Sequence, residues 1–226
     1  MAQQLGLDLP SRPALGRDAF LVAPSNAVAM SLIDGWASWP HGKLVLSGPN
    51  GSGKTHLAHV WADMTGARII AAEDLDETQV AQLAQRAVAV EDVHLIAGND
   101  AAERALFHLH NLVLAEGHHL LLTGVGEPRH WGLTLPDLAS RMQGTTVANL
   151  SPPDDALLSA VLVKLLADRQ LTPKPNLVPY LVGRIDRSFA AAIEIVELLD
   201  TASIAGKRPV TRALAAEVLD KASPPA

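Results

Sequence analysis

Residues 48–55 constrain this chain more than any other segment, because they fit the phosphate-loop pattern G-x-x-x-x-G-K-[ST] at every fixed position. The apolar residues 44–46 before the loop are typical of a buried strand, and residues 56–62 after it are typical of a helix. In this context glycines let backbone N–H groups turn toward a phosphate, and the helix N-terminus adds its positive dipole end. A glycine-rich turn with an incidental lysine is the alternative. The complete pattern between a strand and a helix favours phosphate binding.

The chemistry of the loop predicts a nucleoside diphosphate or triphosphate as ligand. Lys54 reaches the β and γ phosphates in such loops, and the Thr55 hydroxyl binds Mg²⁺. We therefore expect ADP or ATP together with Mg²⁺ as cofactors. The predicted nucleotide-binding residues of this stretch are Asn50, Gly51, Ser52, Gly53, Lys54, Thr55 and His56.

The fold class follows from the alternation of apolar runs and helical patterns. Strands are predicted at residues 44–46, 67–71, 88–90, 119–123 and 146–150. A helix from Ser25 to about Trp39 precedes them, and helices at 54–64, 75–86, 101–116 and 135–142 separate them. This rhythm predicts an α/β fold with a five-stranded parallel sheet covered by helices on both faces.

The sequence changes character at both ends of this region. After the S-P-P-D-D segment at 151–155 strands cease, and four helices are predicted at 154–170, 176–184, 188–204 and 211–221. Residues 1–17 read as an extended tail. We therefore predict three parts: the tail (1–17), a nucleotide-binding base domain (18–150) and a small α-helical lid domain (151–226).

Composition excludes several classes of protein. The chain has 226 residues, of which 48% are hydrophobic and 19% charged, as expected for a globular protein. It has no run of 18 apolar residues and no basic N-terminal segment followed by an apolar one, so we expect no membrane span and no signal peptide. The lack of cysteine is compatible with a cytoplasmic location. The net charge of −6 argues against a broad nucleic-acid surface.

Two acids follow the apolar residues 87–90, at the end of a predicted strand. Ligands bind such sheets at the carboxyl ends of the strands. This position suits Glu91 for the Mg²⁺ shell and Asp92 for activating water, although solvated acids at a strand end are the alternative. Thr123 ends the next predicted strand and is a candidate sensor of the γ-phosphate.

Two arginines and the histidines complete the set of candidates. Arg141 and Arg187 are either surface cations or groups that stabilise transition-state charge, within the chain or across a subunit boundary. Their sequence positions leave both readings open. The nine histidines fit no metal-binding pattern, so we predict no structural metal.

Together these motifs resemble an AAA+ ATPase, and their details resemble the DnaA-related family. Residues 53–59 (GKTHLAH) are similar to the GKTHLxH of bacterial initiators of the DnaA type, and residues 91–98 to their acidic strand end and the loop after it. Residues 138–142 resemble their arginine-finger box, and residues 20–26 the segment that wraps adenine. The resemblance covers nearly all of residues 18–222. Full initiators also carry a C-terminal helix-turn-helix domain that reads origin DNA, and we expect this chain to depart from them by having none.

The resemblance also assigns roles to individual residues. It implies that Leu21 and Val22 contact the adenine, that Thr123 and Arg187 are the first and second sensors, and that Arg141 is a finger that enters a neighbour's site. Glu91 departs from the usual aspartate of the family, which puts strong intrinsic hydrolysis in doubt but not nucleotide binding.

The tail narrows the resemblance to the Hda type of DnaA-related regulator. Its residues 4–9 (QLGLDL) resemble the Q-L-x-L-x-L peptide that binds the sliding clamp, the β subunit of DNA polymerase III. Alternate leucines can enter an apolar groove while glutamine makes directional hydrogen bonds. A leader with ordinary leucines is the alternative. The implied clamp-binding residues are Gln4, Leu5, Leu7 and Leu9.

We therefore expect a cytoplasmic regulator of replication initiation with DnaA and the sliding clamp as partners. It would promote hydrolysis of DnaA-bound ATP through Arg141, while Glu91, Asp92 and Thr123 are the candidate catalytic residues of its own nucleotide site. We expect no sequence-specific DNA contact, and the family leaves a homo-oligomer open. The main alternative is an autonomous ATPase that acts as a helicase loader or a DnaA-like initiation factor. Less favoured are an initiator fragment and an adaptor with a vestigial pocket.

Overall fold

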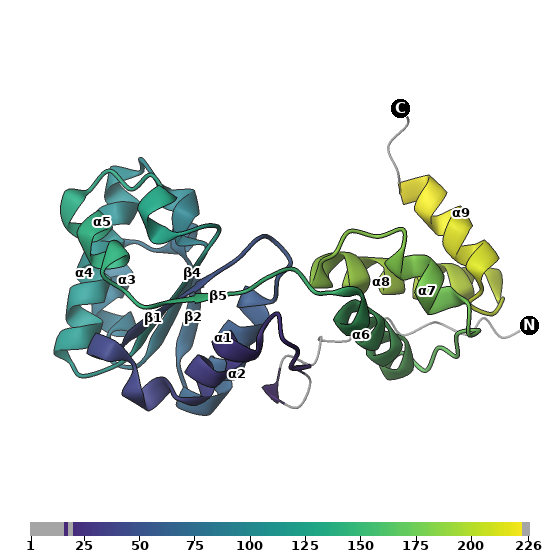
Figure 1. Cartoon of the computed structure of the whole chain (residues 1–226). Coiled ribbons are helices and arrows are strands. Elements are labelled where there is room, and N and C mark those ends of the chain that lie inside the picture. The colour runs from purple at the N-terminus through teal and green to yellow at the C-terminus, as the bar shows by residue number, and fades with distance from the viewer. Residues whose placement is uncertain (1–15, 18–19, 223–226) are drawn as a thin grey trace, which may run out of the picture.

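The structure is a computed structural model that describes residues 16–17 and 20–222 (Figure 1). A sheet with helices on both faces forms one part of the molecule, and a group of helices forms the other. The predicted clamp-binding residues lie outside the described residues: Gln4, Leu5, Leu7 and Leu9.

The sheet has five parallel strands in the order β2-β3-β4-β1-β5. Its strands are β1 (Lys43–Ser47), β2 (Arg68–Ala71), β3 (Val88–Glu91), β4 (Leu120–Gly124) and β5 (Val147–Asn149). Every residue of β1 and β4 is buried, as expected for central strands covered on both faces. The predicted α/β fold is confirmed.

Five helices cover the sheet. They are α1 (Ala27–Asp34), α2 (Lys54–Thr65), α3 (Glu77–Leu83), α4 (Asp100–Ala115) and α5 (Pro136–Gln143). Side chains of β1 alternate between two cores: Leu44 and Leu46 pack with Trp61 of α2, and Val45 packs with Leu106 of α4. This alternation follows from the pleat of a strand, which sends successive side chains to opposite faces.

The first helix is shorter than the sequence predicts. The pattern from Ser25 to Trp39 suggests one helix, but α1 ends at Asp34, and two short 3₁₀ turns follow at Trp36–Ser38 and Pro40–Gly42. Gly35 ends the helix and proline at 40 disfavours helical backbone before it. Because Trp36 and Trp39 continue the apolar spacing, the pattern overestimates the helix.

The second part consists of helices with a core of its own. They are α6 (Asp155–Asp168), α7 (Leu177–Val182), α8 (Phe189–Gly206) and α9 (Arg212–Ala222). Leu162, Leu181 and Val196 are fully buried in this core, which contains no residue of the sheet. Among the residues that the structure describes, no helix combines the length and apolarity needed to cross a membrane.

The strand topology determines where a ligand would bind. The phosphate loop follows β1, the acids end β3, and Thr123 lies near the end of β4. Because the strands are parallel, these segments meet on the side of the sheet where the strands have their carboxyl ends. The helical part contacts the phosphate loop at these carboxyl ends. The backbone N–H of Phe189, at the start of α8, donates to the carbonyl of Gly51 at 2.8 Å.

Candidate functional site

The phosphate loop has the backbone that its glycines allow. Gly51 and Gly53 adopt φ angles of +71° and +98°, in the left-handed region, and Gly53 is the N-cap of α2. A Cβ atom on Gly51 would lie 2.4 Å from the Cβ of Ser188. Position 51 therefore needs glycine both for its backbone angle and for the close approach of the helical part.

Lys54 lies inside this loop. Its side chain is buried, and Nζ donates to the carbonyls of Gly48 and Pro49 at 2.9 and 3.0 Å. Burial lowers the pKa of Lys54 below its ordinary value, and the charges of Asp92 and Glu91 oppose this change. Phosphate oxygens are stronger partners for an ammonium group than neutral carbonyls. Lys54 is thus placed to bind a phosphate at the loop.

The acids and the threonine meet beside the loop. Asp92 has a left-handed backbone (φ +55°), and its N–H donates to the buried hydroxyl oxygen of Thr123 at 3.0 Å. Glu91 is the last residue of β3, and its Oε1 atom is buried without a hydrogen-bond partner among the described residues. Such unpaired buried oxygens are rare and point to a ligand or ion.

The residues present fit the predicted Mg²⁺. This ion prefers oxygen ligands and commonly takes one or two carboxylates together with substrate phosphates. Glu91 offers a carboxylate oxygen without a protein partner, and the side chain of Thr55 is exposed at the start of α2. Within the described part of the chain, no three His, Asp or Glu side chains gather as a metal site. A metal bound jointly by protein and nucleotide agrees with this donor set.

The segment predicted to wrap adenine is fixed in place by Asn26. The buried amide of this residue accepts from Ala23 N–H at 2.8 Å and donates to the carbonyl of Leu21 at 2.9 Å. The adjacent Phe20 ring lies edge-on to His56 of α2, with 5.1 Å between ring centroids. Val22 is 52% exposed. Asn26 is the N-cap residue of α1 but makes no side-chain hydrogen bond to that helix, and its amide instead holds an apolar segment beside α2.

Arg187 lies next to the contact between the two parts of the molecule. Its neighbour Ser188 faces Gly51, while its own guanidinium pairs with Asp155 Oδ1 at 2.9 Å. The Arg187 side chain is 63% exposed. The structure thus brings the segment that follows Arg187 to the phosphate loop, while the Arg187 side chain itself contacts α6.

Arg141 lies near the amino ends of the strands, opposite the carboxyl ends that carry the phosphate loop. Its guanidinium carbon is 5.3 Å from the centroid of the Phe107 ring, and its main-chain oxygen accepts from Lys43 Nζ at 3.1 Å. Lys43 is the first residue of β1, whereas the phosphate loop follows the last. Arg141 is exposed there on α5 and is separated by the length of a strand from the chain's own loop.

The sequence gives little sign of Glu103, although its carboxylate is completely buried in α4. Its oxygens accept from the N–H groups of Gly98 at 2.8 Å, Thr134 at 2.9 Å and Leu135 at 2.6 Å. Burial alone would raise the pKa of Glu103, but these hydrogen bonds lower it below its ordinary value. One carboxylate therefore joins the loop after β3 to the segment before α5.

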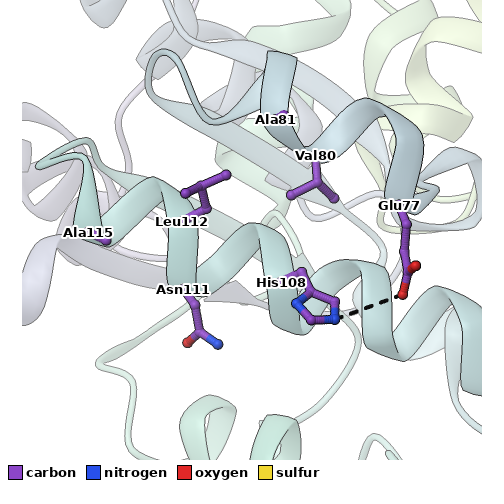
Figure 2. A pocket seen from close by; sticks show the side chains of 7 residues that line it. All are labelled: Glu77, Val80, Ala81, His108, Asn111, Leu112 and Ala115. Atoms are coloured by element: carbon purple, nitrogen blue, oxygen red, sulfur yellow. Dashed lines mark ion pairs between the residues drawn. The ribbon is translucent and has the colours of Figure 1, made fainter.

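A shallow groove of about 550 Å³ lies elsewhere, between α3 and α4 (Figure 2). His108 and Glu77 lie on its two sides, with 3.9 Å between Nε2 and Oε1. Its lining shares no residue with the phosphate loop or the strand ends. The candidate site therefore lies at the carboxyl ends of the strands and contains Lys54, Glu91, Asp92 and Thr123. The groove is separate from it.

Comparison with solved structures identifies the fold. The chain is similar to domain III of the replication initiation protein DnaA of Thermotoga maritima, with 18% identity and a TM-score of 0.78, over 96% of this chain and 100% of that one. It is similar to AMPPCP-bound DnaA of Aquifex aeolicus, with 19% identity and a TM-score of 0.67, over 86% and 68% of the two chains.

A third neighbour is RuvB, the Holliday junction branch migration motor of Thermotoga maritima, with 17% identity and a TM-score of 0.65, over 87% of this chain and 66% of that one. No protein-family model matches the chain. The chain therefore has the fold of DnaA domain III.

Proposed function

We propose that the chain is an Hda-type regulator of replication initiation that acts on ATP bound to DnaA. It would bind ADP or ATP with Mg²⁺ at its own loop, dock on the sliding clamp through its tail, and supply Arg141 to the ATP of DnaA. The observation that carries this proposal is the position of Arg141. It is exposed on α5, near the amino ends of the strands, whereas the chain's own phosphate loop lies at their carboxyl ends. An arginine so placed is better suited to a partner's nucleotide.

Nucleotide binding is supported by the geometry of the loop. Lys54 lies under the loop, Glu91 has an unpartnered oxygen, and Asp92 is fixed against Thr123. The DnaA neighbour from Aquifex aeolicus was solved with AMPPCP. We propose that the adenine lies against Leu21 and Val22, that His56 contributes from α2, and that Arg187 contacts the nucleotide from the lid.

Replacing Lys54 with methionine should weaken ATP and ADP binding about 10- to 100-fold, because one charge-assisted contact contributes roughly 1.5–3 kcal/mol. Isothermal titration calorimetry with Mg²⁺ present measures this change. Lys174→Met, at an exposed lysine of the lid, is the matched control and should bind as the unaltered chain does. Equal affinities for both variants would contradict the proposed role of Lys54.

The clamp-docking role of Gln4, Leu5, Leu7 and Leu9 rests on their sequence pattern. A tail that binds the clamp would hold this chain at a clamp loaded on DNA, with the exposed Arg141 free to reach a DnaA molecule there. The arrangement needs no sequence-specific DNA contact by the chain itself. We further propose a cytoplasmic location.

The proposal is tested by measuring hydrolysis of DnaA-bound ATP with this chain, with and without clamp loaded on DNA. Stimulation should require both components, and deleting residues 1–10 should remove clamp binding without changing nucleotide affinity. Stimulation that is equal with and without the clamp would contradict the docking role. No stimulation in any mixture would contradict DnaA as the target.

The contact between Asp92 and Thr123 favours a second candidate function, an autonomous ATPase of the helicase-loader or DnaA type. An acid and a polar sensor beside the phosphate loop are the parts that intrinsic hydrolysis needs. This candidate predicts turnover by the isolated chain that is lost on Asp92→Asn. The regulator proposal instead predicts that stimulation of DnaA persists in that variant.

A further inference from the structure

Two basic side chains are buried beneath the exposed Arg141. Lys43 is 7% exposed and His110 is 1% exposed, and Lys43 Nζ lies 3.1 Å from His110 Nε2. Burial, followed by the charge of Lys43, lowers the pKa of His110 to about 4, so its ring is neutral at pH 7. A buried lysine usually pairs with a carboxylate. Lys43 instead contacts a neutral imidazole and a main-chain carbonyl.

That carbonyl belongs to Arg141, in the last turn of α5. Carbonyls at the end of a helix lack the backbone partners that they have in its interior. Here the N–H of Gly144 donates to Ser140 O and the N–H of Thr145 to Met142 O, both at 3.1 Å. The oxygen of Arg141 is bonded by side chains instead: Lys43 Nζ at 3.1 Å and the Thr145 hydroxyl at 2.7 Å.

The charges act in the same direction as these hydrogen bonds. An ammonium group at the C-terminal end of a helix is stabilised by the helix dipole. Burial lowers the pKa of Lys43, and the positive charge of Arg141 lowers it further. Repulsion by the buried Lys43 favours a guanidinium that points to solvent. The Phe107 ring contacts this guanidinium, with 5.3 Å between the guanidinium carbon and the ring centroid. The backbone of Arg141 is thus held while its charged group stays accessible.

We propose that Lys43, supported by His110, is a positioning residue for Arg141. Lys43 fixes the main chain of Arg141 from inside the protein, so that the guanidinium is presented in one orientation to the nucleotide of a partner. This inference rests on the proposed role of Arg141 in trans. Lys43 itself does not contact the partner or its ATP.

Lys43 and Thr145 share one acceptor, the main-chain oxygen of Arg141. Because Lys43 and Thr145 donate to the same oxygen, loss of one donor leaves the other in place. Loss of both leaves the oxygen without a side-chain donor. The effects of Lys43→Met and Thr145→Val should therefore exceed additivity when they are combined.

The first measurement needs no partner. Amide hydrogen exchange of the full chain should be about fivefold faster over residues 141–145 in Lys43→Met, and should increase more than multiplicatively in the double variant. Exchange in α2 should stay unchanged. The matched control is Lys174→Met, at an exposed lysine of the lid. Unchanged exchange over residues 141–145 in both Lys43→Met and the double variant would overturn the proposal.

The second measurement is stimulation of DnaA-bound ATP hydrolysis. Lys43→Met should lower the maximal stimulated rate about tenfold and leave the half-saturating concentration unchanged, because misplacement of a catalytic group affects the chemical step more than docking. Lys43→Arg, which retains a charged donor, should restore part of the rate. Thr145→Val supplies an independent test if Lys43→Met fails to fold, and should lower the rate in the same way.

The outcomes separate this inference from the proposed function. If Arg141→Ala abolishes stimulation while Lys43→Met, Thr145→Val and their double variant do not lower it, the positioning role is wrong and the function stands. If Arg141→Ala leaves stimulation intact, the role of Arg141 in trans fails and positioning fails with it. Faster exchange together with a lower maximal rate in Lys43→Met supports both.

Discussion

Replacing Arg141 with alanine is expected to lower the stimulated hydrolysis of DnaA-bound ATP by about 10³–10⁵-fold, the range for arginine fingers supplied in trans to related phosphoryl transfers. The physical reason is the loss of a positive charge at the position where negative charge develops in the transition state. Because Arg141 is exposed, the variant should fold. Single-turnover assays with DnaA preloaded with ATP and with clamp loaded on DNA measure the effect.

The control for this prediction is Arg104→Ala. Arg104 is also an exposed arginine, on the neighbouring α4, and pairs with Asp100. Its loss should leave stimulation unchanged, and Arg141→Ala should retain clamp binding and nucleotide affinity. Arg141→Lys should recover little, since an ammonium group cannot reproduce a planar guanidinium. Stimulation within a few-fold of the unaltered chain in Arg141→Ala would rule out the finger.

Replacing Glu103 with alanine is expected to lower the free energy of unfolding by at least about 3 kcal/mol, because three main-chain donors would lose a buried charged acceptor at about 1–3 kcal/mol each. These donors are the N–H groups of Gly98, Thr134 and Leu135. Urea unfolding followed by circular dichroism measures the loss. Glu103→Gln, which keeps an acceptor oxygen, should lose less.

A matched control and a pH series make the Glu103 prediction specific. Glu116→Ala, at an exposed glutamate that ends the same helix, should change stability by less than about 0.5 kcal/mol. The pKa of Glu103 is lowered in the folded chain, so its contribution is complete above the ordinary value of 4.5 and is lost as pH falls below it. A difference between variant and unaltered chain that is constant from pH 7 to pH 3 would disprove this account.

The sequence predicts the sheet well because its strands carry a strong local signal. Leu120, Leu121 and Leu122 can be placed only in a buried element, and the phosphate-loop pattern fixes both the end of β1 and the start of α2. The strand order then places Glu91 and Thr123 at the carboxyl ends of two neighbouring strands. For these residues, local pattern and parallel topology are sufficient.

The network beneath Arg141 could not be found in this way. Lys43 and His110 are 67 residues apart, and each reads locally as an ordinary polar residue. Glu103 likewise resembles a solvated charge in the first turn of a helix, and its burial depends on a loop 31 residues later. Contacts between distant segments depend on how helices pack, and periodicity carries no information about them.

The two parts of the molecule share no core, and each has its own natural chromophores. All four tryptophans (Trp36, Trp39, Trp61 and Trp131) lie within the strand-bearing part, and the single tyrosine, Tyr180, belongs to α7 among the lid helices. Trp39 and Trp61 stack with 5.3 Å between ring centroids. Tryptophan emission, excited where tyrosine does not absorb, therefore follows the base alone, so the unfolding of this part can be monitored without any label.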